Sequence, residues 1–275
     1  MRLRIGFQVW AQYTTWDELM AAGRTIDELG FDGLWSNDHF LPFTDQSTGS
    51  VENLEGSIFD GWTVLAGWAA ATSRVRLGCL VSGVGYRNPA LLVKMATGLD
   101  HMSGGRMSLG IGAGWFEREH RTFGFPFLPV ADRLDRLEDA AIICRGLLDR
   151  QTVTHAGRWY SADGARNEPP PVQARLPLVI GGSGEKRTLA IVARYADAWN
   201  ADGDDVAALR HKCKVLDEHC RRAGRPPRAV RRTAGQGPAM IRTSRDEAVP
   251  ALAELLQRNG VPWNDALAVA FASPR

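Results

Sequence analysis

Short apolar runs alternate with amphipathic segments along most of this 275-residue chain. The apolar runs predict β-strands at residues 3–9, 31–35, 75–81, 106–111, 178–180 and 198–200. The segments between them carry apolar residues at helical spacing and predict helices at residues 16–29, 60–72, 88–103, 133–148, 186–196 and 206–223. We expect a weaker strand within residues 239–242, a helix at 244–259 and an eighth strand at 267–271. This repeated alternation favours an α/β fold of the (β/α)8 TIM-barrel type over an open sheet.

Local signals mark several of the helix ends. Thr15 and Glu18 have the spacing of a capping box, in which each side chain bonds the other residue's backbone N–H. Asn88 followed by Pro89 combines an N-cap residue with proline at the first helical position. A second capping-box pattern occurs at residues 244–247. We therefore expect helices to begin at all three places.

One stretch departs from the alternation of strands and helices. Residues 152–154 and 158–160 are strand-like and flank a turn, and a run of three prolines follows at residues 169–171. We interpret residues 150–176 as an excursion from the barrel. No linker divides the remainder, so residues 1–275 are predicted to form a single domain.

Composition narrows the class of protein. A formal net charge of +2 is too small to indicate a nucleic-acid partner. The four cysteines are dispersed, which is typical of reduced thiols in the cytoplasm, and residues 211–220 lack the spacing of metal ligands. No secretory leader and no apolar run of membrane-spanning length are recognisable. We expect a cytoplasmic protein, without bound metal, that acts on a small molecule, with a homodimer as one assembly the sequence allows.

The candidate chemistry lies where the predicted strands end. Asp38 and His39 follow the second strand, and residues 80–83 end the third. Residues 112–115 follow the fourth strand, and residues 181–184 follow the fifth. In a parallel barrel all of these ends meet on one face, so a single site can collect them.

Residues 181–184 read Gly-Gly-Ser-Gly and lead directly into a predicted helix. Glycines let backbone N–H groups approach an anion closely, and the helix N-terminus adds a partial positive charge. Lys186 and Arg187 would strengthen such a site. We favour phosphate binding here; the alternative is a tight turn that holds no ligand.

Five aromatic residues near the predicted strand ends are candidates for the walls of a pocket for a flat ring: Trp10, Phe40, Phe43, Tyr86 and Trp115. The alternative is ordinary core packing, although the Gly-Ala-Gly run before Trp115 leaves room beside that ring.

A short acidic segment follows Trp115. Glu117, Glu119 and His120 have helix-like spacing and resemble a set of metal ligands at first sight. We interpret them instead as the solvent-exposed first turn of a helix, where the helix dipole favours acidic residues.

These motifs, taken in order, resemble the luciferase-like monooxygenase superfamily. They read Trp-Ser-Asn-Asp-His-Phe at 35–40, Tyr-Arg-Asn-Pro at 86–89, Ser-Gly-Gly-Arg at 103–106, Gly-Ile-Gly-Ala-Gly-Trp at 110–115, Gly-Gly-Ser-Gly-Glu-Lys-Arg-Thr at 181–188 and Ala-Asp-Ala-Trp-Asn at 196–200. The resemblance extends from about residue 3 to about residue 260. More narrowly, the chain is similar to the members of this superfamily that use the deazaflavin coenzyme F420.

The resemblance implies a barrel that binds the deazaflavin ring at its C-terminal mouth and the phosphate tail at the glycine loop. Asp38 and His39 match positions that contact the ring and assist hydride transfer, so they are the expected catalytic residues. The Leu80–Val81 bond matches a peptide bond that is often cis in the family. The expected cofactor-binding residues are Asp38, Leu80, Val81, Ser82, Gly112, Ala113, Gly114, Gly181, Gly182, Ser183, Gly184, Lys186 and Arg187.

The expected substrate pocket contains Trp10, Phe43 and Trp115. The sugar-phosphate dehydrogenases of the family carry Glu at the position of Trp115 and Trp at the position of Phe43. Because an indole cannot take a proton from a hydroxyl group, the resemblance implies an apolar organic substrate rather than a sugar phosphate.

The sequence therefore predicts an oxidoreductase that transfers a hydride between coenzyme F420 and an unidentified, apolar substrate. One alternative is an FMN-dependent monooxygenase on the same barrel. Another is a metal-dependent hydrolase or isomerase that uses Asp38, His39, Glu117 and His120; it is disfavoured because the first strand exits without a ligand-type side chain. A third is a protein that holds the deazaflavin without catalysis.

Overall fold

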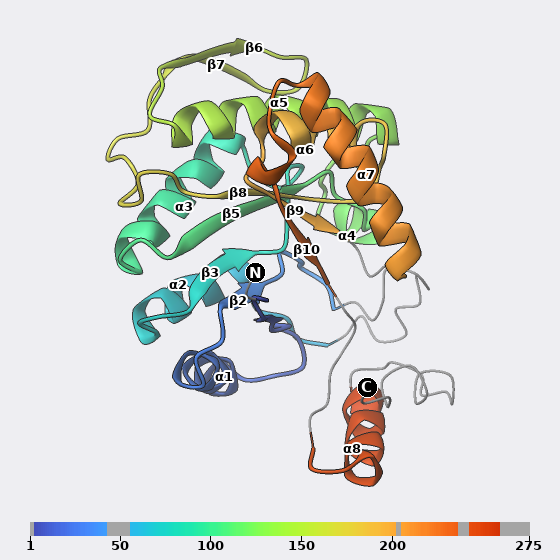
Figure 1. The fold of residues 1–275 in the computed structure, drawn as a ribbon. Helices are drawn as coiled ribbons and strands as arrows, with labels where there is room; N and C mark the ends of the chain where they lie inside the picture. Colours follow the sequence, from blue (N-terminus) through green and yellow to red (C-terminus); the bar gives the residue numbers. More distant parts are fainter. Residues whose placement is uncertain (1–2, 43–55, 202–204, 236–241, 259–275) are drawn as a thin grey trace.

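The computed structural model describes residues 3–42, 56–201, 205–235 and 242–258 (Figure 1). Its main sheet is parallel and curved. The strand order is β1 (Gly6–Gln8), β2 (Gly33–Ser36), β3 (Arg76–Cys79), β5 (Met107–Gly112), β8 (Leu178–Gly181), β9 (Ala198–Ala201) and β10 (Arg231–Ala234), and β4 (Ser82–Gly83) also pairs with β5.

Helices cover the outer side of this sheet, and each packs against the next along the chain. They are α1 (Trp16–Glu28), α2 (Gly61–Ala71), α3 (Pro89–Met102), α5 (Val130–Leu148), α6 (Thr188–Tyr195) and α7 (Val206–Arg222). The remaining helices are the short α4 (Glu117–Thr122), the 3₁₀ turn η1 (Pro227–Ala229) and α8 (Arg245–Arg258). This arrangement confirms the predicted α/β barrel-type fold. None of the helices in the described ranges is long and apolar enough to cross a lipid bilayer.

One strand of the structure was not predicted from the sequence. The strand that follows α7 is β10, which was not predicted because its sequence Arg-Arg-Thr-Ala has no apolar run. Parallel pairing with β9, from Arg231–Ala198 to Ala234–Ala201, defines this strand. Residues 239–241 and the expected eighth strand at 267–271 lie outside the described residues.

The predicted strand at residues 75–81 is divided in two. Its ladder with β5 covers Leu77 and Gly78, and the chain then passes through a cis Leu80–Val81 peptide bond. Pairing with β5 resumes at Ser82. Both segments run parallel to β5, and their register with it shifts by one residue across the interruption, at the C-terminal end of the sheet where the candidate site lies.

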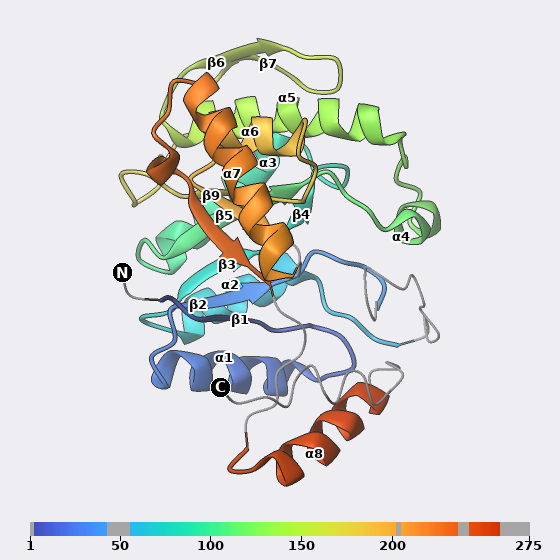
Figure 2. The same cartoon turned by 45° about the vertical axis from the view of Figure 1, so that its right-hand side comes forward.

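The predicted excursion is an antiparallel hairpin of β6 (Val153–Ala156) and β7 (Ser161–Ala165), which lies over α5 (Figure 2). β7 begins later than predicted because the backbone N–H groups of Trp159 and Tyr160 donate to the Asp139 carboxylate on α5 instead of to the ladder. His155 pairs with the same carboxylate at 2.9 Å. One buried acid therefore anchors the excursion to the barrel.

The core shows close contacts between aromatic rings and glycines. The Trp35 ring lies across three neighbouring strands, and a Cβ added at Gly6, Gly33 or Gly78 would come within 2.9 Å of it. Trp68 on α2 is fully buried, and its indole N–H donates to the Leu19 carbonyl at 2.8 Å. These positions exclude larger residues because packed interiors have few voids.

The first testable feature is Asp27, which ties the end of α1 to the loop before β3. It is 7% exposed, and its carboxylate accepts hydrogen bonds from the backbone N–H groups of Ser73, Arg74 and Val75 at 2.7–3.0 Å. Burial raises the pKa of Asp27, but these hydrogen bonds outweigh burial and hold the pKa below its ordinary value.

Asp27→Asn is expected to lower the free energy of unfolding at pH 7 by about 1–3 kcal/mol, because the amide cannot accept all of these bonds. The folded-state pKa lies below the unfolded value of about 3.9, so the stabilisation is complete above that pH and is lost as pH falls through the folded pKa. Urea denaturation at pH 7 and pH 3 checks both statements. Glu28→Gln, at an exposed position of α1, is the matched control, and an equal loss in both variants would contradict the assignment.

Candidate functional site

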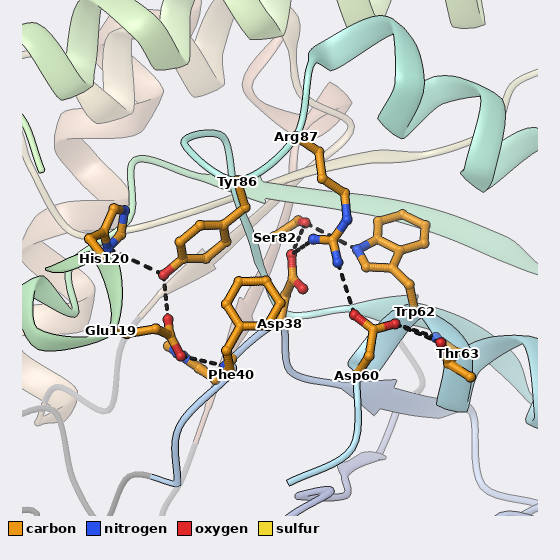
Figure 3. A network of polar contacts seen from close by, with 11 residues as sticks. Asp38, Phe40, Asp60, Trp62, Thr63, Ser82, Tyr86, Arg87, Glu119 and His120 are labelled. Carbon is orange, nitrogen blue, oxygen red and sulfur yellow. Dashed lines mark hydrogen bonds and ion pairs between the residues drawn. The ribbon is translucent and has the colours of Figure 1, made fainter. Parts of the chain in front are cut away.

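The carboxylate of Asp38, at the exit of β2, is buried in a network of polar groups (Figure 3). Asp38 is 1% exposed, and its Oδ2 accepts hydrogen bonds from the Ser82 hydroxyl and, at 2.6 Å, from the Arg87 guanidinium. Its Oδ1 has no partner among the described residues. Burial raises the pKa of Asp38, and the charge of Arg87 and the Ser82 hydroxyl act in the opposite direction. Asp38 and Ser82 are thus brought together as predicted.

Arg87 links this carboxylate to the start of α2. Its second terminal nitrogen lies 2.9 Å from the Asp60 carboxylate, and Asp60 caps α2 through the Thr63 N–H at 2.7 Å. The Trp62 indole N–H donates to the Ser82 hydroxyl oxygen at 3.1 Å. The sequence places Arg87 only within the motif at residues 86–89 and predicts no role for its side chain. The pattern that identifies its role is a lone arginine following a strand end opposite a buried acid.

A second network surrounds Glu119 on α4 (Figure 3). Glu119 is fully buried and accepts hydrogen bonds from His39 Nδ1 at 3.1 Å, from the N–H groups of Phe40 and Leu41, and from the Tyr86 hydroxyl. Burial raises the pKa of Glu119, but hydrogen bonding and charge from His39, together with Tyr86 and Phe40, hold it below its ordinary value. Burial and the Glu119 charge also raise the pKa of the Tyr86 hydroxyl, which therefore stays protonated and donates.

The predicted solvent-exposed first turn of α4 is thus wrong for two of its three residues. Glu117 is exposed and pairs with Arg121, whereas Glu119 and His120 are fully buried. Burial lowers the pKa of His120, whose Nδ1 lies 2.9 Å from the Phe116 carbonyl oxygen. This side of the helix is buried against the segments that follow β2 and β4, which carry His39, Phe40 and Tyr86. No group of three His, Cys, Asp or Glu side chains suited to a metal ion occurs within the described ranges.

Val81 fits into a notch that is formed by glycines. A Cβ added at Gly112 would lie 2.6 Å from Val81 Cγ2, and one added at Gly181 would lie 3.0 Å from both Val81 methyl groups. On the other side of the cis bond, the Gln8 side chain donates to the Leu80 carbonyl oxygen at 2.7 Å. The bulge therefore joins β1, β5 and β8, and brings the start of the glycine loop beside Ser82.

The glycine loop connects β8 to α6. Gly182 has φ of +120°, a conformation that favours glycine, and its carbonyl accepts a hydrogen bond from the Trp199 indole at 2.8 Å. A Cβ at Gly184 would lie 2.8 Å from the Thr188 hydroxyl, so the loop packs closely on the first turn of α6. Of the two basic residues, Lys186 is exposed, whereas Arg187 pairs with Asp135 of α5 at 2.5 Å. The Arg187 side chain is therefore engaged in anchoring α5.

Aromatic rings surround His39. Trp115 approaches the imidazole edge-on, with ring centroids 5.5 Å apart, and stacks on Phe116 at 5.0 Å. Phe40 packs on Tyr86 at 5.0 Å. Trp10 is partly buried after β1, and Phe43 lies outside the described residues. The structure thus brings His39 and Trp115, which were predicted separately for the site, into direct contact.

Removal of the Arg87 charge tests the first network. Arg87→Met is expected to lower the free energy of unfolding by about 3–5 kcal/mol, because it leaves the Asp38 charge buried without compensation. Without Arg87 the pKa of Asp38 in the folded variant lies further above its unfolded value of about 3.9, because burial is no longer opposed by that charge. The loss of stability therefore grows as pH rises above about 3.9. Denaturation at pH 5 and pH 8 measures it, with Arg118→Met on α4 as the exposed control. Adding Asp38→Asn to Arg87→Met should recover part of the loss, and no recovery would contradict the pairing.

The chain is 31% identical to an uncharacterised protein of Mycobacterium tuberculosis over 213 residues, which is 74% of each chain. It is 29% identical to an F420-dependent glucose-6-phosphate dehydrogenase of Microbacterium testaceum over 226 residues. This match covers 81% of this chain and 64% of that protein.

Among solved structures, an F420-dependent secondary alcohol dehydrogenase in complex with an F420-acetone adduct has the same fold. Its TM-score is 0.79 at 23% identity, over 92% of this chain and 74% of that chain. The sequence pattern that defines luciferase-like monooxygenases matches residues 3–273. The chain therefore belongs to the luciferase-like monooxygenase family.

Proposed function

We propose that this protein is an oxidoreductase that transfers a hydride between coenzyme F420 and an apolar organic substrate. The observation that carries the proposal is the placement of His39, an acid–base group, edge-on to Trp115 where β2 and β5 end. Members of the family use F420 or FMN. The order of the motifs supports F420 for this chain.

The residues at the strand ends fit a flat ring with a phosphate tail. The Val81 bulge and the glycines that accommodate it offer a surface without long side chains, and Asp38 Oδ1 is a buried acceptor without a partner among the described residues. We assign ring contacts to Asp38, Leu80, Val81, Ser82, Gly112, Ala113 and Gly114, and phosphate contacts to Gly181, Gly182, Ser183, Gly184 and Lys186. Arg187, which pairs with Asp135, is assigned to support of the loop.

A bound deazaflavin supplies the ring carbon that accepts or gives the hydride. The chain's own part is to bind, to orient and to move a proton. His39 is the acid–base group, because its side chain is 12% exposed whereas its partner Glu119 has no exposure. Trp10, Phe43 and Trp115 are assigned to the substrate. Trp115 presents a large apolar face beside the imidazole and excludes water from it.

Cofactor choice is the first test of the proposal. In a fluorescence titration of the purified protein, F420 should bind at least tenfold more tightly than FMN. The Gly182→Asp variant should weaken F420 binding, because it adds a negative charge where backbone N–H groups are assigned to the phosphate. FMN that remains bound through purification, with no response to F420, would favour the flavin monooxygenase alternative.

Substrate class is the second test. The F420-loaded protein should not reduce F420 with glucose 6-phosphate, because Trp115 offers neither a charge nor a proton acceptor to a sugar phosphate. With reduced F420 it should transfer hydride to apolar carbonyl compounds such as activated enones. Trp115→Glu should raise KM for such acceptors by about tenfold, the equivalent of about 1.4 kcal/mol of lost apolar contact. Efficient oxidation of glucose 6-phosphate by the unaltered protein would contradict the assignment.

A further inference from the structure

We propose that Glu119 is a positioning residue that fixes the proton of His39 on Nδ1, so that Nε2 is the atom that exchanges a proton with the substrate oxygen. The proton exchange with substrate rests on the proposed function, whereas the contact between Glu119 and His39 is independent of it. Glu119 has no exposed surface and cannot touch a ligand at the mouth of the barrel, so its influence must pass through His39.

The donors around the carboxylate determine the tautomer. Oε1 accepts from the N–H groups of Phe40 and Leu41, and Oε2 accepts from the Tyr86 hydroxyl. Because an ionised carboxylate is only an acceptor, the remaining group in contact with Oε2, His39 Nδ1 at 3.1 Å, must carry a proton. In a neutral imidazole the lone pair then lies on Nε2.

The same carboxylate also fixes the orientation of the ring. The two backbone bonds to Oε1 hold the segment directly after His39, and the Tyr86 hydroxyl fixes the other oxygen from the loop before α3 (Figure 3). The edge-on contact with Trp115 limits rotation on the remaining side. A carboxylate bound by so many donors has little freedom, so the imidazole is held in one position before substrate arrives.

The chemistry that follows balances in atoms and charge. In the oxidative direction the substrate's O–H bond breaks and its proton moves to His39 Nε2, while the C–H bond breaks and its electron pair leaves with the hydride to the oxidised cofactor. The products are a carbonyl compound and an imidazolium ion, which Glu119 stabilises. In the reductive direction Nε2 returns the proton to the oxygen. The inferred substrate class is therefore an apolar alcohol or its carbonyl counterpart.

Glu119→Gln makes a sharp test because the position of the amide group is predictable. Its oxygen must face the fixed N–H donors of Phe40 and Leu41, so the amide nitrogen faces His39 Nδ1. The amide NH2 can only donate, so His39 Nδ1 must accept its hydrogen bond, and the imidazole proton moves to Nε2. Nitrogen-15 NMR of the cofactor-free protein should show the Nδ1–H tautomer of His39 in the unaltered protein and the Nε2–H tautomer in the variant.

Glu117→Gln is the matched control, since it changes an exposed acid on the same helix. It should leave the His39 tautomer and the reaction rate unchanged. Tyr86→Phe keeps the carboxylate and removes one donor, so it should preserve the Nδ1–H tautomer. If Glu119→Gln does not fold, the unaltered protein decides the inference by itself, because an Nε2–H tautomer of His39 there would overturn it. Glu119→Asp keeps the charge, so Nδ1–H should persist in that variant.

The kinetic measurement is the single-turnover rate of hydride transfer with F420 and an apolar carbonyl acceptor. Glu119→Gln should slow this step by roughly 10²-fold or more, with less than a twofold change in the dissociation constant of F420. Glu119→Asp should restore at least part of the rate. An unchanged His39 tautomer in Glu119→Gln, or equal losses in rate and F420 affinity, would overturn the role of Glu119. If F420 does not bind at all, the proposed function fails, while the NMR result still decides the inference.

Discussion

The arrangement of the site depends on compensating the charge of one buried carboxylate, that of Asp38. An isolated carboxylate without water costs several kcal/mol, so the chain must bring a cation and hydrogen-bond donors to it. Arg87 and Ser82 meet this requirement, and Arg87 extends the pairing to Asp60 at the start of α2. The same pairing therefore sets the position of the β2 exit, of β4 and of the loop before α3. Two of the residues assigned to the ring, Asp38 and Ser82, take part in this pairing directly.

Close packing adds a constraint that charge alone does not give. Val81 projects into a notch in which Gly112 and Gly181 have no room for a Cβ atom. Because the notch is formed by two neighbouring strands, the position of the bulge depends on the register between β5 and β8. The glycines at these strand ends thus accommodate a side chain from the neighbouring bulge.

Local signals in the sequence predicted the local structure well. The capping box of Thr15 and Glu18 and the N-cap of Asn88 are both present, because each depends on residues within one helical turn. β10 was not predicted because its residues have no apolar pattern of their own and depend on pairing with β9. A strand of that kind is determined by its neighbour, and periodicity within a single sequence cannot identify it.

The residues of the candidate site likewise divide into those that the local sequence identifies and those that depend on distant contacts. Asp38 and His39 could be predicted because they directly follow a recognisable strand, whereas the role of Glu119 depends on a contact across 80 positions of sequence. Helical spacing and charge correctly indicated a helix start but not which side of that helix is buried. The acidic first turn of α4 is compatible with exposure, and only the neighbouring strand ends turn Glu119 inward.

The two buried carboxylates differ in a way that explains a division of roles. Burial acts on both, yet the pKa of Asp38 is raised and that of Glu119 is lowered. The difference lies in their donors: Asp38 keeps one oxygen without a partner among the described residues, whereas both oxygens of Glu119 are bound. A carboxylate with an unused acceptor is suited to meet a ligand, and a fully bound one is suited to hold a neighbouring side chain. Because His39 directly follows Asp38 in the sequence and its Nδ1 contacts Glu119, the proposed acid–base group is linked to both carboxylates.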